Sequence, residues 1–333
     1  MMMKFPEQLS AATPEQYRQA ALENGWMTAL KQAGLFKMFV PRQLGGLELR
    51  LEDALRLLIK SATHHGSLGW IHNLAAGANF FCGYFEEETA AEIFGAPEVL
   101  CSGSGAPTGR IRRTGEGFTA SGTWNFCSGA GYATHFTATA LDEQEQPVTF
   151  ICDAAGVEVS GHWRAFGLKA SSTRQIVMTK QPVPFRYQFE IGRQNSFFEY
   201  PIYRIDFETF ARLCLSATWQ GIAEGFLRHL EDDLSRADAE ISRRIAHIRE
   251  LLSALENRRR AFSTALHEAD YQPADPQAFR KRVASTLSAG HRDIYREAGE
   301  LCWQLGLLIT DEGTCSHWAW RDLQTASQHF FVK

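Results

Sequence analysis

Several features that would assign a function directly are missing from this sequence. Its seven cysteines include no C-x-x-C pair, and their odd number favours reduced thiols over a disulfide framework. No apolar run reaches the ~18–20 residues that span a bilayer. The first residues also lack the apolar stretch of a signal peptide. We therefore expect a cytoplasmic protein with no membrane segment.

The charge balance and the missing motifs exclude further classes. The chain has 34 Lys and Arg residues against 38 Asp and Glu residues, a formal net charge of −4, so it has no basic signature of nucleic-acid binding. It contains no H-E-x-x-H metal motif, no G-x-S-x-G nucleophile motif, and neither G-x-G-x-x-G nor a P-loop. We expect no metal site, no nucleic-acid partner and no NAD(P)H site in this chain.

The spacing of apolar residues changes twice along the chain. It is helical at first, alternates between apolar and polar from about residue 99, and becomes helical again from Asp206. Helices, then strands, then helices indicate an α+β fold and not an alternating parallel βαβ fold. We predict an N-terminal helical domain, a middle antiparallel β domain and a C-terminal helix bundle, with the bounds 1–98, 99–190 and 191–333.

Local signals place individual elements within these regions. Thr13 has the character of a helix N-cap and is followed by Pro14, which predicts one helix from there through Leu30. A further helix is expected over 277–305. The aromatic residues and prolines of 184–204 indicate a linker.

Three segments rich in glycine and small hydroxyl residues are candidates for a ligand site: 100–109, 122–130 and 166–173. Such residues let the backbone approach a planar ligand closely, and Trp124 and Phe126 offer aromatic faces for stacking. The same residue types are also common in ordinary turns at strand ends. The pattern alone leaves both interpretations open.

In their order along the chain, these segments resemble motifs of the acyl-CoA dehydrogenase superfamily. The resemblance covers nearly the whole chain and lies in AGL with VPRQLGG (33–35 and 40–46), GTWNFCSG (122–129), GLKASST (167–173) and WRDL (320–323). It implies an N-terminal helical domain, a β domain and a C-terminal four-helix bundle. It also implies that FAD or FMN binds between the β domain and the bundle of a homodimer or homotetramer.

A dehydrogenase of that superfamily needs a carboxylate base beside the flavin. The two positions that the resemblance implies for it fall on residues 329–331 and on Ala211, and neither holds a carboxylate. Glu208 or Glu224 could supply the base in a shifted register, and Glu312 lies in an EGT stretch that precedes the Arg-Asp motif where the family's stretch follows it. An acyl-CoA dehydrogenase with a relocated base, and a non-catalytic flavin- or ligand-binding member of the fold, therefore remain open as alternatives.

The segment from Arg321 to His329 and the W-x-F-x-S-G pattern resemble the two-component flavin-dependent monooxygenases. In that branch a separate flavin reductase supplies reduced flavin, which reacts with O2 to form a C4a-hydroperoxide. The protein keeps this adduct dry while it oxygenates an aromatic or other small organic substrate. The resemblance implies catalytic roles for His329 and Ser128. A helix-terminal histidine and a turn hydroxyl are the simpler interpretations of the same two residues.

The resemblance also implies a set of cofactor-binding residues: Ser102, Ser104, Trp124, Phe126, Ser128, Gly129, Lys169, Ser171, Ser172 and Thr173. Lys169 stands where the family usually has arginine, so a charge remains but its bidentate geometry is lost. Ala78 or Asn79 stands where a second histidine is expected. His72 lies two helical turns earlier and could replace that histidine only in a shifted register.

Overall fold

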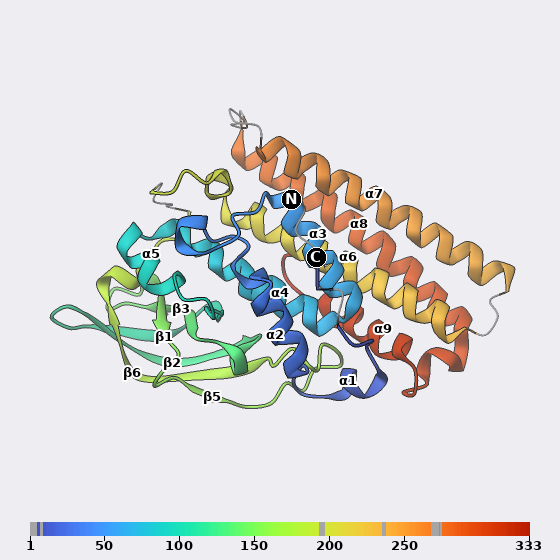
Figure 1. Cartoon of the computed structure of the whole chain (residues 1–333), viewed down its shortest axis with the longest axis horizontal. Helices are drawn as coiled ribbons and strands as arrows, with labels where there is room; N and C mark the ends of the chain where they lie inside the picture. Colours follow the sequence, from blue (N-terminus) through green and yellow to red (C-terminus); the bar gives the residue numbers. More distant parts are fainter. Residues whose placement is uncertain (1–4, 7–8, 193–196, 235–237, 268–272, 274) are drawn as a thin grey trace.

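The computed structural model describes the whole chain except residues 1–4, 7–8, 193–196, 235–237, 268–272 and 274. Within this part, long helices pack beside one seven-stranded sheet (Figure 1). No helix in the described part combines the length and hydropathy that crossing a membrane requires. The α-helices are α1 (Pro14–Arg18), α2 (Asn24–Gln32), α3 (Leu51–His64), α4 (Gly66–Ala78), α5 (Glu87–Phe94), α6 (Phe207–Asp233), α7 (Ala239–His267), α8 (Pro276–Leu305) and α9 (Cys315–Ala326).

The predicted single helix from Thr13 to Leu30 is wrong, because the chain forms two helices, α1 and α2, over this stretch. Thr13 does cap α1, and its side chain accepts a hydrogen bond from the backbone N–H of Gln16. The backbone between the two helices forms contacts with distant parts of the chain instead. Ala21 forms an isolated bridge with Ser171, and the Leu22 N–H donates to the Tyr132 hydroxyl at 2.9 Å. These tertiary contacts outweigh the local preference for a continuous helix.

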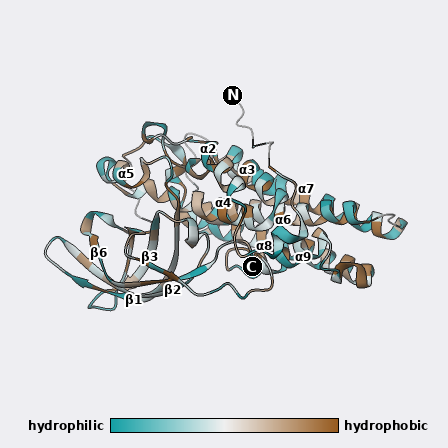
Figure 2. Ribbon diagram, turned by 60° about the horizontal axis from the view of Figure 1, so that its bottom comes forward, coloured by the Kyte–Doolittle hydropathy of each residue, from teal (hydrophilic) through white to brown (hydrophobic). Residues whose placement is uncertain are grey.

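Helix α4 lies between the sheet and the bundle and is hydrophobic along most of its length (Figure 2). It packs on α3 at Gly69 and α3 packs on α6 at Gly221. A Cβ at Gly221 would lie 2.4 Å from the Ile59 carbonyl oxygen, and one at Gly69 would lie 2.3 Å from Cα of Ala62. Glycine therefore sets the close approach of these three helices. One hydrophobic core joins the first and last helical regions of the chain.

The sheet has the strand order β5-β6-β2-β1-β3-β4-β7. Its neighbouring strands are antiparallel except for β1 and β3, which run parallel. The parallel pair arises because the chain leaves β2, passes β1 and adds β3 on the other side, so this part of the sheet differs from the predicted antiparallel arrangement. The strands are β1 (Cys101–Arg113), β2 (Gly117–Cys127), β3 (His135–Leu141), β4 (Pro147–Asp153), β5 (Glu158–Ser160), β6 (Arg174–Pro184) and β7 (Gln188–Phe189).

Parts of the predicted linker over 184–204 form regular structure, and its residues 193–196 lie outside the described part of the chain. Strand β7 lies within the predicted linker and pairs with β4, and a 3-10 helix, Pro201–Arg204, precedes α6. The helix expected over 277–305 is confirmed as α8, whose first turn is capped by the Asp275 side chain. The α+β arrangement is confirmed, and the domain bounds at 98/99 and 190/191 stay a prediction.

Candidate functional site

Two adjoining cavities lie where α4 and the bundle face the sheet. The first, which we call the apolar cavity, has a volume of about 330 Å³. The second, the wide cavity, has a volume of about 980 Å³. Both volumes are in the range of small-molecule and cofactor sites. The cavities meet at a shared wall formed by Leu74, Gly103, Ser104, Gly105, Ser128 and His329.

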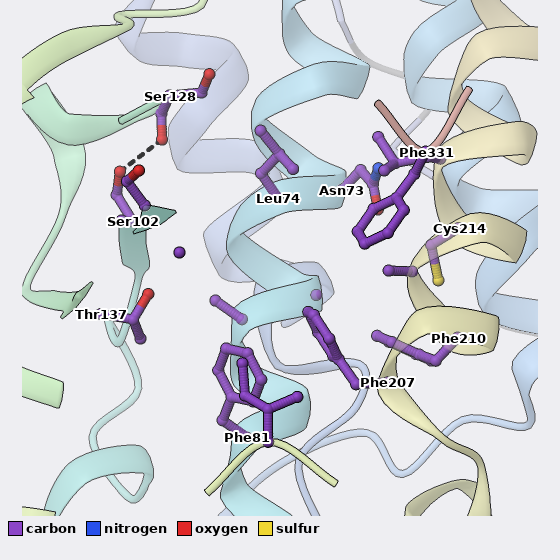
Figure 3. Close-up of a pocket in the computed structure, with 18 of the residues that line it drawn as sticks. Asn73, Leu74, Phe81, Ser102, Ser128, Thr137, Phe207, Phe210, Cys214 and Phe331 are labelled. Atoms are coloured by element: carbon purple, nitrogen blue, oxygen red, sulfur yellow. Dashed lines mark hydrogen bonds between the residues drawn. The ribbon is translucent and has the colours of Figure 1, made fainter. Parts of the chain in front are cut away.

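The apolar cavity is bounded by β1 and β3 on one side and by α4 and α6 on the other. Figure 3 shows Ser102 and Thr137 on the sheet side and Phe207 and Phe210 on the α6 side. Phe81 and Phe331 add two further rings to the wall. None of the described residues that line this cavity is Asp, Glu, Lys or Arg.

The wide cavity lies between the end of β2, the loop that precedes β6, and the end of α9. Its wall combines aromatic rings, including those of Phe126, Trp163 and Phe166, with polar side chains such as Gln324 and Thr173. The Gln324 Oε1 atom is buried and has no hydrogen-bond partner among the described residues. This acceptor, together with the rings, suits a planar ligand that carries N–H groups.

Ser128 is held in a chain of hydroxyl groups at the shared wall. Its Oγ accepts a hydrogen bond from the Trp70 indole N–H at 3.2 Å and lies 2.8 Å from Oγ1 of Thr173. The Ser102 hydroxyl donates to the Ser128 carbonyl at 2.7 Å (Figure 3). Thr173 continues the chain to Ser171 at 2.7 Å. The Ser128 hydroxyl is therefore fixed in position and faces both cavities.

His329 enters the shared wall from the segment that follows α9. Its Nδ1 accepts a hydrogen bond from the Phe331 N–H at 3.3 Å, and its ring packs edge-to-face on Trp70. Burial lowers the pKa of His329 to about 4, so the ring is neutral near pH 7. Since Nδ1 is an acceptor, Nε2 carries the proton, and it has no partner among the described residues. The side chain is thus a neutral hydrogen-bond donor at the junction of the two cavities.

Of the non-glycine residues with left-handed backbone, three lie in the segments around the wide cavity: Phe126 at φ 64°, Leu168 at φ 51° and Ser172 at φ 48°. Phe126 and Leu168 line the wide cavity, and Phe126 is 75% exposed. Such conformations cost roughly 1 kcal/mol or more each and concentrate at functional sites. An exposed phenylalanine held in this way is consistent with contact to a ligand.

Asp322 ties the 167–173 loop to α9 and, through α9, to His329. The Leu168 N–H donates to Asp322 Oδ1 at 2.5 Å. Gly167 packs so closely on α9 that a Cβ there would lie 2.1 Å from the Arg321 carbonyl oxygen. Burial raises the pKa of Asp322 to about 7. The sequence singled out the Arg-Asp motif without revealing this positioning role, and it gave no signal for Trp70, Asn73, Trp163 or Gln324.

Not every residue that the sequence singled out reaches a cavity. Trp124 is fully buried in the sheet's own core, where its indole N–H donates to the Thr139 carbonyl at 2.8 Å, so the expectation that its face stacks on a ligand is wrong. His72 is also buried and contacts Ser61 and the Leu35 carbonyl, so it does not replace the missing second histidine. Ala78 lines the apolar cavity in that region.

The remaining predicted cofactor residues divide into two groups. Ser102, Ser104, Phe126, Ser128 and Thr173 line at least one of the cavities. Gly129, Lys169, Ser171 and Ser172 line neither of them. Gly129 instead forms a left-handed turn at φ 76° whose N–H donates to the Ser171 carbonyl at 2.9 Å, so these residues shape the loop behind the wall.

No carboxylate stands in a position to act as a base in either cavity among the described lining residues. Ala211 lines the apolar cavity at one of the positions that the family resemblance reserves for the base. Glu208 pairs with Arg212 at 3.0 Å, and Glu224 accepts a hydrogen bond from Gln220 at 2.7 Å. Glu312 also lines neither cavity.

Comparisons with known proteins agree with this architecture. No protein-family model matches the chain. It is 25% identical over 224 residues to the flavin-dependent monooxygenase oxygenase subunit HsaA of Mycobacterium tuberculosis, which covers 63% of this chain and 57% of HsaA. It is 22% identical to the indole-3-acetate monooxygenase of Pseudomonas putida over 95% of this chain and 85% of that protein. The chain thus matches less than two thirds of the length of HsaA.

The fold of this chain is also similar to the folds of solved structures. XiaF from Streptomyces sp., in complex with FADH2 and glycerol, superposes with a TM-score of 0.86 at 19% identity, covering 96% of this chain and 87% of XiaF. HsaA of M. tuberculosis superposes with a TM-score of 0.84 at 20% identity, covering 94% and 89% of the two chains. The chain therefore has the acyl-CoA dehydrogenase-like fold, as its sequence predicts. Within that fold, the chain resembles the two-component flavin-dependent monooxygenases.

Proposed function

We propose that this protein is the oxygenase component of a two-component flavin-dependent monooxygenase. The observation that carries the proposal is the pair of cavities that meet at Ser128 and His329. One cavity has the size and aromatic wall of a flavin site, and the other has those of a site for a small organic substrate. The reacting centres of two such ligands would come together at this shared wall.

The residues of the wide cavity fit a flavin. Phe126, Trp163 and Phe166 provide ring contacts, and the buried Gln324 Oε1 offers an acceptor for a ring N–H. Ser128 and Thr173 would face the same ligand. When bound as FAD or FMN in its reduced form, the flavin supplies the electrons that activate O2.

The chain's own residues would control the reaction at the shared wall. His329 would donate a hydrogen bond from Nε2 toward O2 at the shared wall. Ser128 would orient the flavin through its fixed hydroxyl. Leu74 and the rings of the apolar cavity would keep water away from the reacting atoms. A neutral histidine suits this role because it donates a hydrogen bond without bringing a charge into an apolar site.

The absence of a carboxylate from the lining argues against an acyl-CoA dehydrogenase. Proton abstraction beside a thioester needs a base within hydrogen-bond reach of the substrate. One of the two positions that the family resemblance reserves for it holds Ala211, whose methyl group cannot accept a proton, and the other falls on residues 329–331, which include no carboxylate. A relocated base has no candidate among the described lining residues.

The proposal includes a separate flavin reductase as partner. It is supported by the lack of a dinucleotide motif in this sequence and by the designation of HsaA as an oxygenase subunit. A homodimer or homotetramer is a further part of the proposal, supported by the exposure of Trp303 (84%) in the last turn of α8 and of Leu307 (86%) in the 3-10 helix that follows it. A cytoplasmic location is supported by the seven free cysteines, six of which are buried.

The proposal is tested by anaerobic titration of the protein with FADH2, FMNH2 and the two oxidised flavins. We expect saturable binding of at least one reduced flavin. After mixing with O2 and a panel of small aromatic compounds, we expect a hydroxylated product. Failure to bind any flavin in either redox state would remove the proposed function. Bleaching of a bound oxidised flavin by an acyl-CoA would instead assign the dehydrogenase activity.

A further inference from the structure

We propose that the apolar cavity selects an uncharged aromatic compound with a hydrogen-bond-accepting oxygen, and that Asn73 is the residue that recognises this oxygen. This inference rests on the proposed function, because it names the substrate class of the same site. It concerns binding in the apolar cavity, so it can be tested separately from oxygen transfer.

The first argument is the charge of the cavity wall. The described residues that line it include four phenylalanines and no Asp, Glu, Lys or Arg. Arg212 follows the lining residue Ala211, but it does not line the cavity, and its guanidinium is bonded to Glu208 and to the Phe331 carbonyl. His329 is neutral because burial lowers its pKa. A carboxylate that entered this cavity would lose its hydration and find no cation among the described lining residues in return.

The second argument is the unsatisfied amide of Asn73. This residue lies on α4 in the cavity wall (Figure 3) and is only 2% exposed. Its Nδ2 atom has no hydrogen-bond partner among the described residues. A buried donor without a partner is rare in folded proteins and is costly, so a ligand oxygen is the expected acceptor.

The contrast with Asn79, near the end of the same helix, supports this assignment. Asn79 is equally buried, but its Nδ2 donates to the Phe36 carbonyl at 2.8 Å and so has a structural task. His72, the chain neighbour of Asn73, also uses both ring nitrogens within the protein. Asn73 therefore differs from His72 and Asn79 in having a side-chain nitrogen without a partner among the described residues.

The lack of charge among the described lining residues bears on the substrate for which one relative is named. The indole-3-acetate monooxygenase of P. putida is named for a carboxylate substrate. The cavity described here offers that carboxylate no cationic partner among its described lining residues. We therefore expect the cavity to bind indole more tightly than indole-3-acetate.

The test compares matched ligands by calorimetric titration at pH 8 under anaerobic conditions. The pairs are indole with indole-3-acetate, and 4-ethylphenol with 4-hydroxyphenylacetate, each measured with and without bound reduced FAD. The neutral member of each pair should bind roughly 100-fold more tightly than the acid, because the acid loses its hydration without a partner. Equal affinities, or tighter binding of the acids, would overturn the inference.

Two variants test the residues separately. Asn73→Leu should weaken the binding of 4-ethylphenol about 5- to 10-fold, which is the usual effect of one lost hydrogen bond. It should leave the binding of indole nearly unchanged, because indole has no acceptor oxygen. Equal losses for both ligands would show that Asn73 only supports the wall. Ala78→Lys places a cation at the cavity and should restore binding of 4-hydroxyphenylacetate, whereas an acid-binding deficit that persists would contradict the charge argument.

These outcomes are distinct from failure of the proposed function. If neutral aromatic compounds bind as expected but reduced flavin does not bind, the oxygenase function fails and the cavity assignment survives. If reduced flavin binds and the compounds are oxygenated, but acids and neutral compounds bind alike, the oxygenase function survives and the substrate class proposed here fails.

Discussion

At the scale of single residues, the shared wall of the two cavities depends on side chains whose polar atoms are already oriented. Ser128 is fixed by Trp70 and Thr173, and His329 is fixed in one tautomer by the Phe331 N–H. Orientation before the ligand arrives lowers the reorganisation that the reaction requires. His329 is the residue whose removal tests this most directly, because its Nε2 has no other task in the described part of the chain.

We predict that His329→Ala uncouples oxygen consumption from substrate oxygenation. The fraction of consumed O2 released as hydrogen peroxide should rise by about 10-fold or more, because the loss of one preorganised donor typically costs two to three orders of magnitude in rate. Peroxide and product are measured together in a single-turnover reaction with reduced flavin. The control is His247→Ala, which removes an exposed imidazole outside both cavities. Unchanged coupling would remove His329 from the chemistry.

The residue scale also explains where the sequence-based interpretation of the site succeeds and where it fails. Trp124 and Phe126 are two residues apart and would point to the same face of a regular strand. The pairing of β2 with β6 shifts register between Trp124 and Cys127, and Phe126 turns into a left-handed conformation. One ring therefore enters the sheet's core and the other faces the wide cavity. A backbone irregularity of this kind leaves no trace in apolar alternation.

At the scale of elements, the site depends on how closely the helices approach one another. Gly69 and Gly221 bring α3, α4 and α6 together, and α4 carries Trp70 and Asn73 to the cavities. The helices themselves are predictable from their spacing. How closely the helices approach one another is not predictable, because it depends on where a glycine of one helix meets the backbone of another. The same holds for the break between α1 and α2, which is set by contacts with Tyr132 and Ser171 far along the chain.

We predict that Gly221→Ala lowers the free energy of unfolding by about 2–3 kcal/mol, since its new methyl group would overpack a rigid backbone. The matched control is Gly299→Ala in α8, where nothing lies within 4 Å of the added Cβ. That variant should be more stable than the wild type by about 0.5–1 kcal/mol, the helix propensity difference. The free energies of unfolding of both variants and of the wild type are measured by urea denaturation. A similar change in both would mean that Gly221 does not set the α3–α6 distance.

At the scale of the whole molecule, several histidines are buried in the helical core. Burial lowers the pKa of His72 and of His291 to about 4, and both rings are hydrogen-bonded inside the protein. In the unfolded chain the same groups titrate near pH 6.5. Below that pH the unfolded state takes up protons that the folded state does not, so the fold loses stability as the pH falls from about 6.5 to about 4.

The expected loss is about 3 kcal/mol for each of these two histidines between pH 7.5 and pH 4. Asp322 offsets part of it: burial raises its pKa to about 7, so its cost to stability grows as the pH rises from about 4 to about 7. Urea unfolding at pH 7.5 and at pH 5 should show a lower free energy at pH 5. Burial also lowers the pKa of His64, His65, His229 and His329, so a double variant, His72→Asn with His291→Asn, should lose only the part of this difference that its two histidines contribute. A pH-independent free energy in the wild type would contradict the prediction.

The overall arrangement is the part of the molecule that sequence reasoning captures best. The change from helical to alternating spacing and back predicts the α+β succession, and the ordered motifs point to the acyl-CoA dehydrogenase-like fold that the solved structures confirm. The parallel pairing of β1 with β3 is not predictable in the same way. Strand order depends on how the chain crosses the sheet, and alternation reports only which face of each strand is buried.

The left-handed conformation of Phe126 has a consequence for directed evolution. This residue is 75% exposed and occupies a conformation that glycine or asparagine adopts at lower cost. A library screened only for resistance to heat would therefore enrich glycine and asparagine at this position, and either residue would remove an aromatic ring from the wide cavity. Leu168 has the same backbone conformation but is buried in the core, so the loss of its side chain would cost more than the relieved strain. Selection for thermal tolerance and selection for turnover would pull Phe126 in opposite directions.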